Sequence, residues 1–217
     1  MEEIFPGVYR RKDRLYTENL VPGETVYGES TVTEDGTEYR SWSPSRSKAA
    51  AALKKGLREF PVERSSEVLY LGASTGTTVS HFSDIASSGV VYAVEHSPKI
   101  ARQLLESMEE RGNVAPILAD ARKPEEYSAQ VSKVDLLYQD VAQQDQVDIL
   151  KRNAEKFLLE GGHAMIAVKA RSISASRDPD DVFDEVKEGL RESFEILDGK
   201  KLSPFHEDHL FLVLQHL

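Results

Sequence analysis

Residues 67–78 read Glu67-Val68-Leu69-Tyr70-Leu71-Gly72-Ala73-Ser74-Thr75-Gly76-Thr77-Thr78, and they decide the fold. An apolar run ends in a turn that contains Gly72 and Gly76, and about 20 residues later the next apolar run closes on Glu95. A doubly wound sheet binds a nucleoside with this order of buried strand, glycine turn and carboxylate. The stretch therefore predicts a binding site for a cofactor that contains adenosine.

Apolar β-branched runs alternate with helical patterns from Val68 onward. Strands are expected near 68–71, 90–94, 114–118, 134–138 and 163–168, and helices around 77–87, 98–111, 143–159 and 181–192. This alternation predicts an α/β fold with a parallel sheet that is covered on both faces. The last two apolar runs, 194–197 and 209–214, are separated only by a loop, which predicts a closing antiparallel pair.

The first 50 or so residues have a different pattern. Short aromatic-rich pieces at 4–9, 25–27 and 38–42 are separated by Pro-Gly and Asp-Gly turns, which predicts a small antiparallel sheet with a hairpin. The alanine-rich segment 47–57 predicts a helix, with Ser43 or Ser45 as its cap. We therefore expect a small β module over 1–50 and an α/β domain over 51–217.

The composition excludes several classes of protein. The chain has 217 residues and a net charge of −10, which argues against capture of nucleic acid by bulk attraction. It has no cysteine, and its six histidines show no metal-ligand spacing, so no metal site is expected. No apolar run is long enough to span a bilayer, and the acidic start lacks the pattern of a secretory signal. A cytoplasmic protein is expected.

Nicotinamide oxidoreductases and methyltransferases share the first half of this layout, and the residues at the later strands distinguish them. Asp120 ends the third predicted strand, Asp140 follows the fourth with Gln143 close behind, and Lys169 ends the fifth. A nicotinamide oxidoreductase is disfavoured, because the glycine spacing is wrong for its pyrophosphate turn and no Tyr-x-x-x-Lys pair occurs. Acidic and basic groups at neighbouring strand ends favour methyl transfer. A tight turn with no ligand remains the alternative for the glycines.

Lys169 alone would be interpreted as a strand-end lysine that extends into water. Beside Asp140 a functional role is favoured, because each charge lowers the cost of partly burying the other. Lys48 and His209 are candidates to complete the same cleft, although a surface role is expected for either one taken alone.

A set of motifs spread over nearly the whole chain resembles fibrillarin. The motifs are Tyr39-Arg40-x-Trp42-x-Pro44-x-Arg46-Ser47-Lys48, the turn from Gly72 to His81, Asp120-Ala121-Arg122-x-Pro124, Asp140-Val141-Ala142-Gln143, Lys169-Ala170-Arg171-Ser172-Ile173 and Pro204-Phe205-x-x-Asp208-His209. The glycine- and arginine-rich tail of eukaryotic members is missing, so the chain is similar to the archaeal form. Ser74-Thr75, His96 and Leu210 depart from the usual family residues.

The resemblance implies a class I S-adenosylmethionine-dependent methyltransferase with a Rossmann-like, seven-stranded, mostly parallel sheet behind a small N-terminal antiparallel β module. It implies catalytic roles for Lys48, Asp140, Lys169 and His209, and RNA contacts for Arg46, Lys48 and Arg171. The positions implied for S-adenosyl-L-methionine are Gly72, Ala73, Gly76, Thr77, Thr78, Glu95, His96, Asp120, Ala121, Asp140, Val141, Ala142 and Gln143.

The implied reaction is 2′-O-methylation of ribose in rRNA, with tRNA as a second substrate, by the catalytic subunit of a box C/D guide ribonucleoprotein. The implied partners are guide and target RNA, a Nop-family scaffold protein and a kink-turn-binding protein of the ribosomal type, in the cytoplasm of an archaeal cell and with no membrane. The alternatives are another class I methyltransferase with a different acceptor and a non-catalytic assembly subunit.

Overall fold

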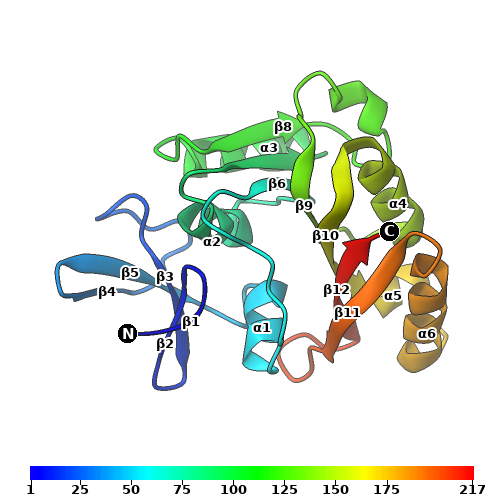
Figure 1. Ribbon diagram of the computed structural model, residues 1–217, viewed down its shortest axis with the longest axis horizontal. Coiled ribbons are helices and arrows are strands. Elements are labelled where there is room, and N and C mark those ends of the chain that lie inside the picture. The colour runs from blue at the N-terminus through cyan, green and yellow to red at the C-terminus, as the bar shows by residue number, and fades with distance from the viewer.

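A seven-stranded sheet forms the centre of the molecule, in a computed structural model that describes all 217 residues (Figure 1). Its strands are β6 (Glu67–Leu71), β7 (Val90–Glu95), β8 (Val114–Leu118), β9 (Val134–Gln139), β10 (Leu158–Lys169), β11 (Phe194–Lys201) and β12 (His209–His216). They lie in the order β11-β12-β10-β9-β6-β7-β8, and only β12 runs antiparallel to its neighbours. The predicted mostly parallel sheet and its closing antiparallel pair are confirmed.

Helices cover both faces of this sheet, as the alternating pattern predicted. The helices are α1 (Lys48–Lys54), α2 (Thr77–Ile85), α3 (Pro98–Ser107), α4 (Gln146–Phe157), α5 (Ala170–Ile173) and α6 (Pro179–Leu190), with a 3₁₀ turn η1 at Pro124–Tyr127. One core cluster joins α1, α2 and α3 to one face, and a second joins α4 and α6 to the other. None of the helices is long and apolar enough to cross a membrane.

Several element boundaries differ from the predictions, by up to five residues. The helix expected over 143–159 begins only at Gln146, because the residues after β9 form an irregular connection at the edge of the sheet. The strand expected over 163–168 begins already at Leu158, and its pairing with β9 shifts register between Leu158 and His163. Gly161 lies within this irregular part with a φ of 72°. The apolar run alone therefore marked only the regular end of the strand.

The N-terminal residues form a separate antiparallel sheet (blue in Figure 1). Its strands are β1 (Glu2–Phe5), β2 (Val8–Arg11), β3 (Arg14–Glu18), β4 (Thr31–Glu34) and β5 (Thr37–Trp42), in the order β1-β2-β3-β5-β4. The predicted piece 4–9 is divided between two strands by the turn at Pro6-Gly7. The piece 25–27 is not a strand, because the carboxylate of Glu29 binds the backbone N–H groups of Val26 and Tyr27.

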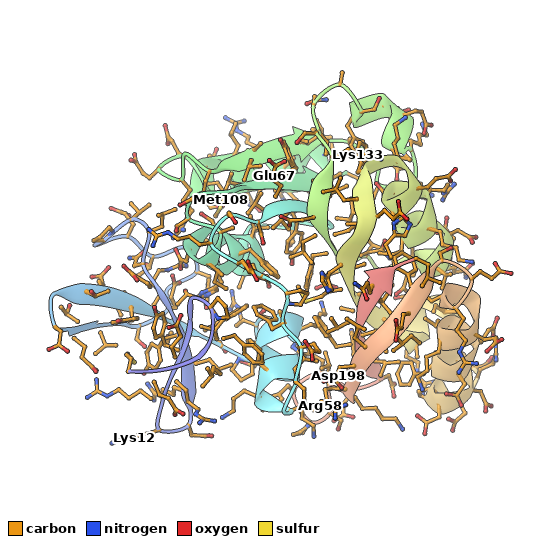
Figure 2. All side chains as sticks on the ribbon, in the orientation of Figure 1. Lys12, Arg58, Glu67, Met108, Lys133 and Asp198 are labelled. Carbon is orange, nitrogen blue, oxygen red and sulfur yellow. The ribbon has the colours of Figure 1, made fainter.

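Helix α1 connects the two sheets, and its cap is Ser47, not Ser43 or Ser45 as predicted. The Ser47 hydroxyl accepts a hydrogen bond from the N–H of Ala50 at 3.4 Å. The four alanines at 49–52 are fully buried in the core cluster that also contains residues of both sheets. After α1 the chain is tied to β11, because the backbone N–H of Arg58 donates to the buried Asp198 at 2.8 Å (Figure 2).

A buried cluster of charges also connects the N-terminal sheet to α2. Arg40 is fully buried and pairs with Glu29 at 2.5 Å and with Asp84 at 2.8 Å. Arg111 pairs with the other oxygen of Asp84 at 2.7 Å. The ring of His81, also fully buried, stacks on Trp42 with a centroid distance of 4.9 Å. We call these residues, Glu29, Arg40, His81, Asp84 and Arg111, the interface cluster.

Candidate active site

A cavity of about 380 Å³ opens at the carboxyl ends of β6, β7, β8 and β9, which is where parallel sheets bind ligands. It is of the size that small-molecule sites have. Its lining comprises Gly72, Ser74, Val94, Glu95, His96, Ala119, Asp120, Ala121, Arg122, Asp140, Val141, Ala142, Gln143 and Ile149.

Gly72 allows the turn after β6 to approach the Asp140 segment closely, and both line the cavity. It has a φ of 83°, and a Cβ there would overlap the backbone carbonyl oxygen of Asp140. The N–H of Asp140 in turn donates to the carbonyl of Leu71 at 2.9 Å. A larger residue at position 72 would push the Asp140 segment away, so the glycine fixes the spacing between the turn and that segment.

Glu95 is held in place by the backbone at the rim of the cavity. Its side chain accepts hydrogen bonds from the N–H of Ser74 at 3.0 Å and from the N–H of Ser97 at 2.9 Å. Each carboxylate oxygen has one such bond and retains capacity to accept another from a ligand hydroxyl. His96 lies beside it, with Nδ1 3.3 Å from the carboxylate and 68% of its side chain exposed.

Asp120 is paired with Arg122, a lining residue that was not among the predicted site residues. The guanidinium donates to both carboxylate oxygens, with Nη2 2.7 Å from Oδ2, and these bonds lower the pKa of the Asp120 carboxyl. The spacing Asp-x-Arg after a strand was the only sequence signal for this pair. Asp120 therefore stays ionised as an acceptor at the cavity wall.

Four predicted cofactor residues, Ala73, Gly76, Thr77 and Thr78, do not line the cavity. Gly76 has a φ of 92°, and a Cβ there would collide with Met108. The hydroxyl of Thr78 donates to Ser47 Oγ at 3.0 Å. The structure thus gives Gly76 a local role in packing the start of α2 against α3, and Thr78 one in packing α2 against α1. Five lining residues were not predicted: Ser74, Val94, Ala119, Arg122 and Ile149.

Lys48 and Asp140 meet at the end of the cavity. Lys48 Nζ lies 2.7 Å from Asp140 Oδ2, and about a quarter of each side chain is exposed. Lys169 and His209 are direct partners in the β10–β12 ladder, so their Cα atoms lie side by side at the adjoining strand ends. The Lys169 ammonium has no ion-pair partner within the chain, and residue 169 is exposed. The structure thus places Lys169 in the solvated strand-end position. We call Lys48, Asp140, Lys169 and His209 the cleft cluster.

His209 has a defined tautomer. Its Nδ1 lies 2.6 Å from the carbonyl oxygen of Glu207, and because a carbonyl can only accept, Nδ1 carries the proton. Nε2 is then the acceptor of the neutral ring. Burial lowers the pKa of His209, and the positive charges of Lys48 and Lys169 act in the same direction. The ring is therefore neutral near pH 7.

Comparison with known proteins identifies the family to which this arrangement belongs. A family model of fibrillarin matches residues 1–216. The chain belongs to the fibrillarin family. The fibrillarin-like rRNA/tRNA 2′-O-methyltransferase of Pyrococcus horikoshii is 48% identical over 217 residues, which is 97% of this chain and 96% of that protein.

Solved fibrillarin structures share the fold throughout. The Methanococcus jannaschii fibrillarin pre-rRNA processing protein aligns with a TM-score of 0.96 and 48% identity, over 99% of this chain and 96% of that one. The Aeropyrum pernix fibrillarin in complex with natively bound S-adenosyl-L-methionine gives 0.88 and 46%, over 95% and 92%. A fibrillarin/Nop5p complex gives 0.92 and 45%, over the full length of both chains.

Gln146 is a buried residue beside the site that the motifs did not reveal. It is fully buried, and its amide donates to the carbonyl of Gln143 at 2.7 Å, while its oxygen accepts from the N–H of Lys169 at 3.2 Å. One side chain therefore ties the Asp140–Gln143 segment to the end of β10. Its sequence signal was weak, because glutamine at the start of a helix is common on surfaces.

The two arginines expected to contact RNA differ in their availability. Arg46 is exposed, and its guanidinium lies 5.5 Å from the centre of the Tyr27 ring. Arg171 donates to Asp208 at 2.8 Å and to the carbonyls of Ala175 and Arg177 at 3.0 and 3.2 Å. Arg46 is thus free to meet a phosphate, whereas Arg171 already organises its own loop.

The residues of the cavity fit an adenosine-containing sulfonium ligand. Glu95 and Asp120 provide acceptors for ribose hydroxyls and for an amino group, and both line the cavity with Asp140. The close approach that Gly72 allows brings the Asp140 segment into the same cavity wall. Asp120 is paired with Arg122 and Asp140 with Lys48, so Glu95 is the lining carboxylate that has no lysine or arginine partner.

Proposed function

We propose that this fibrillarin-family protein transfers a methyl group from S-adenosyl-L-methionine to ribose 2′-hydroxyls of rRNA, and of tRNA. The observation that carries this proposal is the double position of Asp140, which lines the cofactor cavity and also binds Lys48 in the cleft cluster. The Asp140 segment therefore connects the cavity for the methyl donor with the cleft cluster, whose charged groups would contact the ribose that accepts the methyl group. Relatives with nearly half of their residues identical are named 2′-O-methyltransferases.

The cavity residues hold the cofactor. When bound, S-adenosyl-L-methionine supplies an electrophilic methyl group on a sulfonium ion. Glu95 accepts from the ribose hydroxyls, Asp120 accepts from the adenine amino group, and the Asp140–Gln143 segment surrounds the methionine end. These assignments rest on the lining of the cavity and, for Glu95, on the acceptor capacity that its carboxylate retains.

The cleft cluster prepares the acceptor. A ribose hydroxyl is a weak acid, so it need only be oriented and lose its proton as the new C–O bond forms. Asp140 and Lys169 act as one coupled unit that positions the hydroxyl and receives this proton. Lys48 holds Asp140 in place through its 2.7 Å ion pair. His209 offers Nε2 as an acceptor, so it orients the substrate or relays the proton.

RNA is bound locally and with help from partners. Arg46 and Lys48 lie at the start of α1 and meet a backbone phosphate of the target strand. A chain with a net charge of −10 does not hold RNA by bulk attraction, so RNA binding requires partners. Pairing with a box C/D guide RNA selects the target. A Nop-family scaffold docks the enzyme, which the fibrillarin/Nop5p complex supports. A kink-turn-binding protein anchors the guide, and the assembly works in the cytoplasm.

The proposal is tested by transfer of labelled methyl from S-adenosyl-L-methionine to guide-paired RNA, with the scaffold and kink-turn proteins present or omitted. The product is then digested with alkali. A 2′-O-methyl group removes the nucleophile that cleaves RNA in alkali, so label should remain in alkali-resistant dinucleotides. The transfer should require guide and partners.

Two other outcomes would contradict the proposal. Label in alkali-released mononucleotides would mean that a base is methylated, which is the expectation for another class I methyltransferase. Absence of transfer from an assembled complex with measured cofactor binding would instead indicate a non-catalytic assembly subunit.

A further inference from the structure

A compact turn connects β11 to β12 and ends at His209. Leu202 is fully buried at its start, and its N–H donates to the carbonyl of His209 at 2.9 Å. The carbonyl of Leu202 accepts from the N–H groups of Phe205 at 2.9 Å and of His206 at 3.2 Å. Phe205 packs against the core cluster of the sheet. These hydrogen bonds and this packing link the residues of the turn, so a contact that fixes one of them fixes the whole turn.

His206 ties this turn to a distant part of the chain. Its Nε2 lies 2.9 Å from the carbonyl oxygen of Pro44, which lies 162 positions away in the sequence. Because the carbonyl can only accept, His206 Nε2 carries the proton. Pro44 lies in the turn that leads into Ser47, the N-cap of α1, and the buried alanines of α1 fix that helix in the core. The Pro44 carbonyl is therefore a fixed anchor, and the turn is the part that is held.

The same turn sets the orientation of His209. The carbonyl of Glu207, one residue after His206, accepts from Nδ1 of His209 at 2.6 Å. This bond leaves Nε2 of His209 as the free acceptor, which the proposed role requires. A turn that moved would carry the Glu207 carbonyl with it. The ring would then be free to rotate or to exchange its tautomer.

We propose that His206 is a positioning residue for the methyl transfer, which acts by holding the 202–208 turn against Pro44 so that Glu207 fixes the tautomer of His209. The motifs quoted for the family leave position 206 open, and the contact of His206 with Pro44 is seen only in the tertiary structure. The inference rests on the proposed function for its effect on rate, and on the structure alone for its effect on the His209 ring. His206 itself does not touch the reacting atoms.

The test uses the full-length chain with three substitutions at position 206. His206→Phe keeps a ring but removes the donor, His206→Ala removes the side chain, and His206→Gln restores a donor at the same distance from the backbone. His216→Phe is the matched control, because His216 Nδ1 also lies 3.3 Å from a backbone carbonyl, that of Leu159, far along β12 from His209.

The first measurement is the ring ¹⁵N shifts of His209 by NMR near pH 7.5, where the ring is neutral. The wild type and His206→Gln should show a proton on Nδ1, whereas His206→Phe and His206→Ala should show exchange between both tautomers. The second measurement is guided methyl transfer. The two donor-less variants should lose about 10- to 100-fold in kcat, with the KM for RNA and the Kd for cofactor unchanged, because only the alignment is lost.

The outcomes separate the inference from the proposed function. Unchanged His209 shifts in both donor-less variants would overturn the inference, even if no methyl transfer is detected in any sample. Changed shifts with an unchanged kcat would also overturn it, because the turn would then not matter for the reaction. A kcat loss that His206→Gln does not restore, or that His216→Phe shares, would indicate a general loss of structure instead.

Discussion

The interface cluster and the cleft cluster both combine acidic, basic and histidine side chains, but they differ in whether every charged group has a partner. In the interface cluster Arg40, Glu29 and Asp84 have side chains that are 0–1% exposed, and both acids have an arginine partner. In the cleft cluster Lys48 and Asp140 are 25% and 22% exposed, and the Lys169 ammonium has no partner. The first arrangement is closed, and the second keeps groups available for a substrate.

This difference shows how charge can serve structure or chemistry in one chain. Buried charges are tolerated only when each has partners, and removal of one partner leaves the other desolvated and uncompensated. Partly exposed charges cost little to hold, so their removal leaves the fold nearly unchanged. We therefore expect substitutions in the two clusters to separate stability from catalysis.

The largest effect is expected from Arg40→Ala in the interface cluster. It leaves Glu29 buried without its ion-pair partner and Asp84 with one partner fewer. The free energy of unfolding should fall by about 3–5 kcal/mol, measured by urea denaturation. The kcat of the folded fraction should stay the same. Arg10→Ala is the control, because Arg10 forms an exposed ion pair with Glu2 and should change stability by less than about 0.5 kcal/mol. Equal stability of the two variants would contradict a structural role for the interface cluster.

The opposite result is expected for Lys169→Ala in the cleft cluster. The kcat for guided methyl transfer should fall by about 100-fold or more, because a group that orients the acceptor and handles its proton is lost. The midpoint of urea unfolding should shift little, since the ammonium has no partner in the fold. Lys156→Ala, at an exposed position of α4, should change neither quantity. A Lys169→Ala protein that unfolds early but turns over normally would reverse the assignment.

Glu95→Gln tests an intermediate case, a carboxylate that is 7% exposed but held only by backbone N–H groups. The amide has one acceptor oxygen where the carboxylate has two, so it cannot serve both backbone donors and two ribose hydroxyls. The Kd for S-adenosyl-L-methionine should rise about tenfold, which is about 1.4 kcal/mol, by isothermal titration calorimetry. The KM for RNA should not change. A rise in that KM without a change in the cofactor Kd would place Glu95 on the RNA side.

The sequence predicted those parts of the site that lie in strand-end motifs. The strands, the glycine turn and the charges at 95, 120, 140 and 169 follow from the apolar runs and the residues that end them, because period and burial fix where a parallel strand ends. Thr77 and Thr78 stay predictions: neither lines the cavity, and the hydroxyl of Thr78 donates to Ser47 in the α1–α2 contact.

Other residues could not be predicted, because their roles depend on contacts between distant segments. Gln146 bridges two strand ends, and His206 reaches Pro44 across 162 positions. The interface cluster was also missed, since Glu29 and Arg40 resemble ordinary surface residues in the sequence. Only the tertiary structure shows that both are buried.

A fall in pH should lower stability through His81 of the interface cluster and the rate of methyl transfer through His209 of the cleft cluster. His81 is fully buried, and burial together with the positive charges of Arg40 and Arg111 holds its pKa well below the usual 6.5. The unfolded chain therefore binds a proton at this residue where the folded protein does not, and stability is present above pH 6.5 and lost as the pH falls. From His81 we expect a loss of up to about 1.4 kcal/mol per pH unit in the free energy of unfolding between pH 6.5 and 5.

His209 should control the rate in the same pH range, because its lowered pKa keeps the ring neutral below pH 6.5. The kcat should decline only below that pH. His209→Gln should remove the decline and leave most of the pH dependence of stability in place, since His81 is the more deeply buried ring. Urea unfolding and kcat are measured in parallel from pH 5 to 7.5. If His209→Gln abolished the pH dependence of stability, the acid sensitivity of the fold would belong to the cleft and not to the interface.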